Sequence, residues 1–282
     1  MIRTVVLMIA LMLIFMFVGN AIAGEQGMII AFLMACTINF FSYFFSDKIV
    51  LKQYKATKVT MQSAPELYSV VSKLSKTAGL PMPQIYIIPE QVPNAFATGR
   101  NPEHAAVAVT QGLLNTLSAP EIEGVLAHEM SHIKHYDILI GSISAVFAGA
   151  IAMLSNIARY NTVTSNRVSS NSRQHGAPGI IAIILMPIAA TIIQMSISRT
   201  REYKADEGSA RLTKHPEWLM SALAKLENFA QNYRMQNASS QTAHMFIINP
   251  FSGLKSISGL FSTHPSTKDR LKRLEKLKKE IH

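Results

Sequence analysis

The sequence has little charge and almost no cysteine. Its 282 residues include a single cysteine, Cys36, so no disulfide can form within the chain. Only 16% of the residues are charged, whereas 49% are hydrophobic and the mean hydropathy is +0.20. This balance is too apolar for an ordinary soluble domain of this length, so we expect segments that lie in a membrane.

Acidic residues are scarce relative to basic ones. The chain has 17 Asp and Glu against 27 Lys and Arg, a formal net charge of +10 at pH 7. A basic chain can bind nucleic acid, but no zinc-finger or RNA-binding motif supports that partner, and we expect none. In an apolar chain, basic residues more often mark the cytoplasmic flanks of membrane segments and contacts with anionic lipid. The lipid bilayer is therefore an expected partner.

Two long uncharged runs open the chain. Residues 4–23 and 28–45 are apolar and are separated by only four residues, which favours a membrane hairpin of two helices over residues 1–45. The small residues at 21–23 resemble a signal-peptide cleavage site, which is an alternative for the first run. Lysines follow the second run and none lies in the short loop. The positive-inside rule therefore predicts a cytoplasmic N-terminus and a cytoplasmic segment after residue 45.

Two weaker apolar runs, at residues 138–158 and 179–197, contain several polar residues. We expect them to form a second membrane hairpin over residues 137–198, with a buried or re-entrant hairpin as the alternative. Residues 46–136 and 199–282 would then be two parts of one domain on the cytoplasmic side. The second part ends in a basic amphipathic helix, which we expect to pack on this domain rather than contact lipid.

Within residues 46–136, residues 64–79 have the pattern of a surface helix that ends at Gly79. Three short β-prone runs follow, at residues 85–88, 94–99 and 105–110. They predict a small sheet with an edge strand, and such an edge can bind an extended peptide through main-chain hydrogen bonds. The sheet could equally be a support for the helix that follows it.

His128 and His132 belong to the pattern His-Glu-x-x-His, which lies in a segment expected to be helical. Ser118 and Glu121 have the spacing of a capping box, and apolar residues follow at helical spacing. Residues four apart share one face of a helix, so both imidazoles can reach one zinc ion. Glu129 lies beside them and can act on a water at the metal. A chance match in a chain of this length is expected about once in a hundred.

A catalytic zinc site needs a third protein ligand. The number of membrane crossings made by the two later apolar runs suggests where in the sequence this ligand lies. If both runs cross the membrane, the chain after them returns to the side of the two histidines. Glu202 is the first acidic residue there, and Asp206 follows on the same helical face. Glu202 would leave a fourth zinc position for water, and Asp206 could accept a hydrogen bond from a ligand histidine. His135 is a rival ligand, but its position one turn further along would stretch the metal geometry.

Several separated motifs together resemble one known family. They are HEMSH at 128–132, REYKAD at 201–206, NAFATG at 94–99 and THPS at 263–266. In this order they resemble the HtpX-type membrane zinc metalloproteases, bacterial and archaeal relatives of the CAAX prenyl proteases. The sequence and the resemblance together predict a mainly α-helical fold with a small β-sheet. Integral membrane helices would accompany a zincin-like (gluzincin) catalytic domain formed by residues 46–136 and 199–282.

The resemblance also implies an activity and roles for individual residues. The chain would be a zinc-dependent endopeptidase of the inner membrane that hydrolyses misfolded or damaged membrane proteins at the cytoplasmic face. One zinc ion per chain would be bound by His128, His132 and Glu202. Glu129 would be the catalytic base, and Asp206 would support a ligand histidine.

Other site residues are less closely defined by the motifs. His264 lies where the family has His-Pro-Pro, but in this sequence Ser follows the proline. Two interpretations stay open: His264 assists catalysis, or the proline after it shapes a turn. Asn94, Ala95 and Phe96 would bind substrate if their strand is the sheet edge. Two other classes fit less well, because a structural zinc site needs four protein ligands and a transporter needs ionisable residues within its membrane segments.

Overall fold

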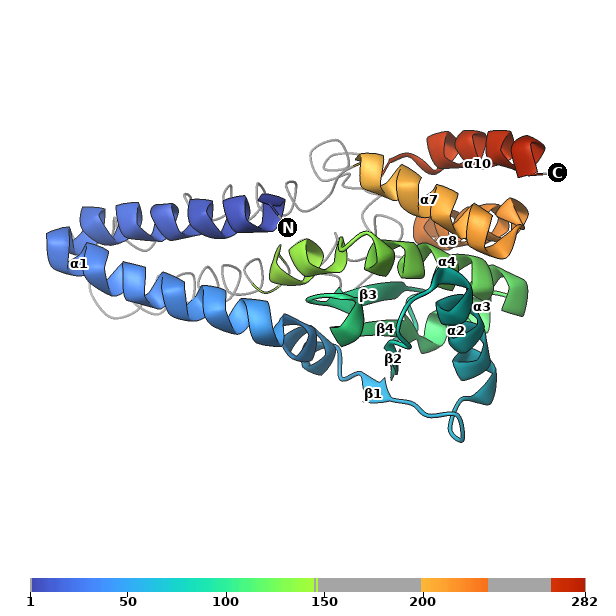
Figure 1. The fold of residues 1–282 in the computed structure, drawn as a ribbon, viewed down its shortest axis with the longest axis horizontal. Coiled ribbons are helices and arrows are strands. Elements are labelled where there is room, and N and C mark those ends of the chain that lie inside the picture. Colours follow the sequence, from blue (N-terminus) through green and yellow to red (C-terminus); the bar gives the residue numbers. More distant parts are fainter. Residues whose placement is uncertain (1, 145, 147–198, 233–264, 282) are drawn as a thin grey trace, which may run out of the picture.

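The computed structural model describes residues 2–144, 146, 199–232 and 265–281, which form a mainly helical fold with one small sheet (Figure 1). This confirms the predicted fold class. Most of the expected second membrane hairpin lies outside the described residues. The elements are, in order, α1 (Ile2–Gln53), β1 (Thr57–Lys58), α2 (Pro65–Ala78), β2 (Gln84–Ile88), β3 (Ala95–Gly99), η1 (Pro102–His104), β4 (Ala105–Thr110), α3 (Gln111–Thr116), α4 (Ala119–Lys134), α7 (Arg199–Thr213), α8 (Pro216–Asn232) and α10 (Thr267–Ile281).

Helix α1 folds back on itself as a hairpin of two arms (Figure 1). The helical geometry is interrupted at Ala23 and Gly24, and Gly24 has a φ of 61°, in the left-handed region that glycine tolerates. The two arms approach each other closely beside this turn. A Cβ added to Gly19 would lie only 2.4 Å from the carbonyl oxygen of Gly27. The turn thus lies where the sequence predicted the loop, and the second arm continues past the apolar run to Gln53.

Both arms of α1 expose large apolar side chains. Phe17 is 75% exposed, and Leu13, Ile30 and Leu33 are each 59% exposed. Within the described part of the chain, Ala23–Gln53 is the one helix long and apolar enough to cross a membrane, by length and composition. An apolar surface of this extent is unusual for a soluble monomer and agrees with the expected membrane segment.

The sheet has the strand order β1-β2-β4-β3. Strands β2 and β4 are parallel, whereas β3 pairs antiparallel with β4 and forms one edge of the sheet. The three longer strands lie where the β-prone runs predicted them. Strand β1 was missed because its two residues are too few to show an alternating pattern.

The two faces of the sheet are covered by different parts of the chain. Val107 and Val109 of β4 belong to the main core, which also contains buried residues of α2, α4, α8 and α10. Phe96 and Ala108 point the other way and cluster with Val50 near the end of α1. The sheet therefore separates α4 from the base of the α1 hairpin.

Helix α4 starts with the capping box that the sequence predicted, and α7 crosses it at close range. Ser209 of α7 donates a hydrogen bond of 2.7 Å to the carbonyl oxygen of Gly124. At Gly208 of α7, an added Cβ would lie 2.2 Å from the hydroxyl oxygen of Ser131. Small residues at both contacts let the two helix backbones approach, which brings together side chains that are far apart in the sequence.

Helix α10 packs its apolar face on the domain, as expected for the basic C-terminal helix. Leu274 is fully buried in the main core, and Leu271, Leu277 and Ile281 pack against that core. Its lysines lie on the remaining surface of the helix.

Candidate metal centre

Helix α4 places the two histidines of the motif against each other. The Nε2 atoms of His128 and His132 lie 3.2 Å apart, and the two rings meet edge to face with centroids 4.8 Å apart. The two residues are four apart on one helix, so their side chains project from the same face. The Nε2 atoms of both histidines are therefore directed toward one point.

Helix α7 brings Glu202 to the histidines from 70 positions further along the chain. Its Oε2 lies 3.7 Å from Nε2 of His128, and its Oε1 lies 3.6 Å from Nε2 of His132. The ligand atoms of the three residues all lie within 4.8 Å of one another. The trio named from the sequence is thus brought together by the close packing of α4 and α7, and it could hold a metal ion.

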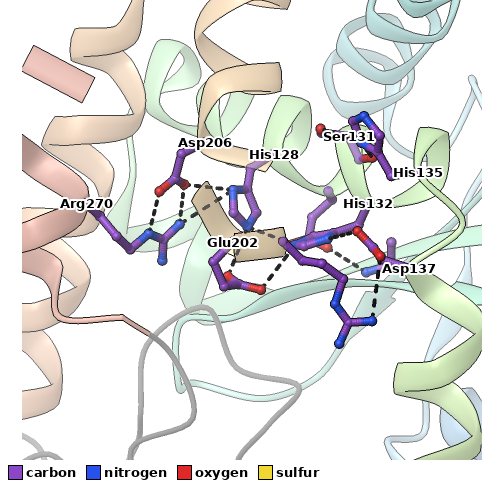
Figure 2. A network of polar contacts seen from close by, with 11 residues as sticks. His128, Ser131, His132, His135, Asp137, Glu202, Asp206 and Arg270 are labelled. Carbon is purple, nitrogen blue, oxygen red and sulfur yellow. Dashed lines mark hydrogen bonds and ion pairs between the residues drawn. The ribbon is translucent and has the colours of Figure 1, made fainter. Parts of the chain in front are cut away.

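The other ring nitrogen of His128 faces a buried carboxylate and a buried arginine (Figure 2). Nδ1 of His128 lies 3.0 Å from Oδ1 of Asp206. Arg270 of α10 donates to both carboxylate oxygens of Asp206, at 2.9 Å from Nε and 2.6 Å from Nη2. The side chains of His128, Asp206 and Arg270 are only 3%, 2% and 1% exposed, so water screens their charges little.

These contacts shift the pKa values of His128 and Asp206 in opposite directions. Burial by itself would lower the pKa of His128, but its contacts with Asp206 and Glu202 raise that pKa to about 9. Burial would raise the pKa of Asp206, but the charge of Arg270 and the hydrogen bonds lower it to about 2. Asp206 is therefore ionised at neutral pH and presents a full negative charge to His128.

Glu129 is held between α4 and the edge strand. One of its carboxylate oxygens accepts a hydrogen bond of 2.8 Å from the main-chain N–H of Ala97 in β3. Glu129 is 5% exposed, and this burial raises the pKa of its carboxyl group. A carboxylate in this setting has one fixed orientation and is a stronger base than a carboxylate in water.

His132 also lies beside a carboxylate and an arginine, and neither was predicted from the sequence as a site residue. Nδ1 of His132 lies 3.4 Å from Oδ2 of Asp137 (Figure 2). Nη1 of Arg201 lies 3.6 Å from Oδ1 of Asp137. The side chains of His132, Asp137 and Arg201 are 16%, 17% and 14% exposed. This side of the site is therefore partly open to water.

Arg270 was missed because it is one of many basic residues in the C-terminal helix. A signal was nevertheless present in the sequence. Arg270 precedes Leu274 by four positions and Ile281 by eleven, so it lies on the apolar face of α10. A charged residue on an apolar face is seldom fully buried unless it is paired, which would have predicted a buried acidic partner.

His135 and the predicted substrate-binding residues are not among the three residues that could hold a metal ion. His135 is exposed, and its Nδ1 lies 2.8 Å from the carbonyl oxygen of Ser131 in the last turn of α4. Asn94, Ala95 and Phe96 are 2%, 1% and 4% exposed, so their side chains are not free to meet a substrate. His264 lies outside the described residues.

The fold and the site together define a zincin-like metallopeptidase. Its features are a helix with the pattern His-Glu-x-x-His, a carboxylate from a later helix, and a small sheet whose edge strand contacts the first helix. Residues 61–278 match the model of peptidase family M48, and the chain belongs to this family.

Curated relatives give a narrower description. The chain is 66% identical over 281 residues to the "Protease HtpX homolog" of Campylobacter hominis, covering 99% of each chain. It is 50% identical over 280 residues to the protein of the same name from Pyrococcus furiosus, covering 99% of this chain and 96% of that one. The resemblance inferred from the sequence is thereby confirmed: the chain is an HtpX-type metalloprotease, which uses a metal ion and acts on polypeptides.

A solved structure shares the fold. The crystal structure of S. mikatae Ste24p is 19% identical to this chain, with a TM-score of 0.51. The similarity covers 98% of this chain and 65% of that one. At this identity, the comparison supports the architecture of helices and sheet and nothing more specific.

Proposed function

We propose that the chain is a zinc-dependent endopeptidase of a bacterial or archaeal inner membrane, with its catalytic domain at the cytoplasmic face. One observation carries this proposal, namely the convergence of His128, His132 and Glu202 on one point beside a buried Glu129. The first three residues are the proposed ligands, and Glu129 is the proposed catalytic base.

The separations of the ligand atoms suit zinc. Tetrahedral coordination with bonds of about 2.0–2.2 Å separates neighbouring ligand atoms by about 3.3–3.6 Å. In this site the two imidazole Nε2 atoms are 3.2 Å apart, and each lies near a different oxygen of Glu202, at 3.7 Å from Oε2 for His128 and 3.6 Å from Oε1 for His132. Two imidazoles and one carboxylate are a ligand set of catalytic zinc sites, and they leave a fourth position open.

The surrounding residues suit peptide hydrolysis. When bound, zinc would activate water and polarise the scissile carbonyl group. Glu129 would take a proton from the attacking water and pass it to the leaving nitrogen. The hydrogen bond from Ala97 holds the carboxylate in place, and burial raises the pKa of this carboxyl group, which makes it a better proton acceptor. Asp206 would accept the Nδ1–H of His128, which leaves Nε2 for the metal.

We place the substrate along the outer edge of β3, in an extended conformation. The side chains of Asn94, Ala95 and Phe96 are buried, and both main-chain groups of Asn94 bond Thr110 of β4, so of these three residues Ala95 would contact the substrate, through its main chain. The ring of Phe96 packs on Tyr54, with centroids 5.6 Å apart, and so connects the edge strand to the segment just after the α1 hairpin.

The membrane location rests on the α1 hairpin. Its exposed apolar side chains would lie in the bilayer, and the lysines after the second arm would face the cytoplasm. The second hairpin, at residues 137–198, remains a prediction. A catalytic domain attached at the base of membrane helices is suited to misfolded or damaged membrane proteins, which we propose as the substrates in membrane protein quality control.

The variant Glu129→Gln tests the proposed function. The amide oxygen of Gln can still accept the hydrogen bond from Ala97, so the zinc content should stay near the wild-type value. Gln cannot take a proton, so hydrolysis of unfolded casein by the purified protein should fall by about 10²–10⁴-fold or more. Glu123→Gln is the matched control on the same helix, because Glu123 pairs with the exposed Lys73 and should be dispensable.

A chelator should abolish wild-type cleavage, and added zinc should restore it. Retained hydrolysis in zinc-loaded Glu129→Gln would show that another residue is the base. We also expect the wild type to cleave itself once detergent replaces the bilayer, because access to the site is then unrestricted. Equal stability of the wild type and Glu129→Gln during incubation with zinc would contradict this expectation.

A further inference from the structure

Asp137 is brought to His132 by the way in which helix α4 ends. The main-chain N–H of Asp137 donates to the carbonyl oxygen of His132 at 3.0 Å, and that of Tyr136 donates to the carbonyl oxygen of Ile133 at 3.1 Å. These two bonds form a Schellman motif, in which the first residue beyond the cap is left-handed and is usually glycine. Here that residue is Tyr136, with a φ of 59°.

The left-handed conformation of Tyr136 has a consequence for the site. A non-glycine residue in this conformation carries a conformational cost, and Tyr136 is 47% exposed, so burial of its ring does not account for the turn. The turn at this residue ends α4. It thereby brings the carboxylate of Asp137 to the imidazole of His132, with Oδ2 3.4 Å from Nδ1.

Arg201 holds the same carboxylate from the other helix. Its Nη1 lies 3.6 Å from Oδ1 of Asp137. Oδ2 of Asp137 faces His132 (Figure 2). Arg201 directly precedes Glu202 in α7. One turn of α7 therefore supplies both the carboxylate that faces Nε2 of His132 and the arginine that holds the acceptor on its Nδ1 side.

We propose that Asp137, held by Arg201, is a positioning residue for His132. Its carboxylate accepts the Nδ1–H of His132 and so directs the Nε2 lone pair toward the metal. A carboxylate on the far nitrogen fixes the tautomer and the ring orientation and makes the imidazole a better ligand. Arg201 acts through Asp137, by keeping a carboxylate that is 17% exposed from turning toward water. The inference rests on the metal site proposed above.

The test is zinc affinity, measured on the full chain in detergent by competition with a chromophoric chelator. Asp137→Ala should weaken zinc binding by about 10–100-fold. Asp137→Asn should recover much of this loss, because its amide oxygen can still accept the Nδ1–H. Both variants keep the main-chain N–H that closes α4, and thermal unfolding of the metal-free protein checks that the fold is intact. Glu207→Ala, at an exposed position of α7, is the control.

The role of Arg201 is tested by combining variants. Arg201→Gln should weaken zinc binding less than Asp137→Ala does, and the double variant should bind as Asp137→Ala alone does, because the arginine acts through the carboxylate. The visible spectrum of the cobalt-substituted protein should change in Asp137→Ala and stay unchanged in Glu207→Ala. Additive losses in the double variant would overturn the role given to Arg201.

The turn itself provides a third variant pair. Tyr136→Gly relieves the left-handed conformation and should leave zinc affinity unchanged, whereas the β-branched Tyr136→Val disfavours this conformation and should weaken zinc binding. Unchanged affinity in Asp137→Ala together with a loss in Glu202→Ala would overturn this inference alone. Unchanged affinity in both Asp137→Ala and Glu202→Ala would overturn the proposed metal site, and the inference with it.

Discussion

The two histidines of the candidate metal centre have the same kind of support in different surroundings. On one side, His128, Asp206 and Arg270 are 3%, 2% and 1% exposed, and the arginine–carboxylate distance is 2.6 Å. On the other, His132, Asp137 and Arg201 are 16%, 17% and 14% exposed, and the corresponding distance is 3.6 Å. One side is dry and tightly bonded, and the other touches water.

The difference follows from where the supporting residues come from. Asp206 and Arg270 lie on two separate helices, α7 and α10, and meet only when α10 packs on α7. Asp137 comes from the turn at the end of α4 itself, at the margin of the packed region. Charge pairs in a dry interior are costly to break, whereas pairs that touch water are weaker and easier to change. Four predictions test this contrast, from the largest effect to the smallest.

The largest effect is expected from removing the buried arginine. Arg270→Met would leave Asp206 ionised, buried and without its cation, which should destabilise the protein by roughly 3–5 kcal/mol. Arg201→Met on the open side should cost about 1 kcal/mol or less. Thermal unfolding of both metal-free variants in detergent at neutral pH measures the difference, and equal losses would contradict the contrast between the two sides.

Glu202 belongs to both sides, because its two oxygens face the two histidines. Glu202→Ala should lower zinc affinity by more than about 100-fold, above the range for residues that only support a ligand. Asp206→Ala should fall within that range, at about 10–100-fold, and His135→Ala should keep wild-type zinc content. The measurement is metal per protein after dialysis against graded chelator. An unaffected Glu202→Ala together with a metal-poor His135→Ala would refute the ligand set.

The ion pair of Glu121 and Lys225 joins a buried group to an exposed one. The carboxylate of Glu121 is buried, whereas the side chain of Lys225 is 47% exposed. Burial would raise the pKa of Glu121, but hydrogen bonds from Lys225, Ser221 and the N–H of Ser118 lower it to about 2. The folded-state pKa lies below the ordinary value of 4.5, so this stabilisation is complete above pH 4.5 and is lost as the pH falls toward about 2. Its size should be on the order of 2 kcal/mol, after allowing for the exposed lysine.

This pH dependence is measured by unfolding the wild type and Glu121→Gln between pH 7 and pH 3. The stability difference between the two proteins should be largest at neutral pH and should shrink steadily below pH 4.5. Glu123→Gln, on the same helix, should give a small and constant difference. A constant difference in Glu121→Gln as well would show that its hydrogen bonds do not favour the ionised form.

The smallest effect is expected for an ion pair on the protein surface. Arg211 pairs with Glu207 on the surface of α7, with side chains that are 62% and 45% exposed. Arg211→Ala should change the free energy of unfolding by about 0.5 kcal/mol or less, because water and salt screen the pair. Unfolding at low and high salt checks this value. A loss comparable to that of Arg270→Met would mean that burial does not set the scale.

The sequence by itself determined the elements whose signals are local. The capping box and the His-Glu-x-x-His spacing placed α4 and both histidines, since a helix start and a helical face depend on residues within a few positions. The β-prone runs located β2, β3 and β4, and the apolar runs located both arms of α1. Glu202 could be suggested only by assuming that two weakly apolar runs both cross the membrane. No local pattern around Glu202 connects it with the histidines.

Only the tertiary structure decided which charged groups are buried and which are exposed to water. Arg270 looks like its basic neighbours in the sequence, and it is buried because α10 lies over Asp206, 64 positions away along the chain. Phe96 looked available to a substrate, and it is buried because the base of α1 covers that face of the sheet. The free energy of a charge or a ring depends on whatever packs around it, and those neighbours come from segments that no local pattern connects.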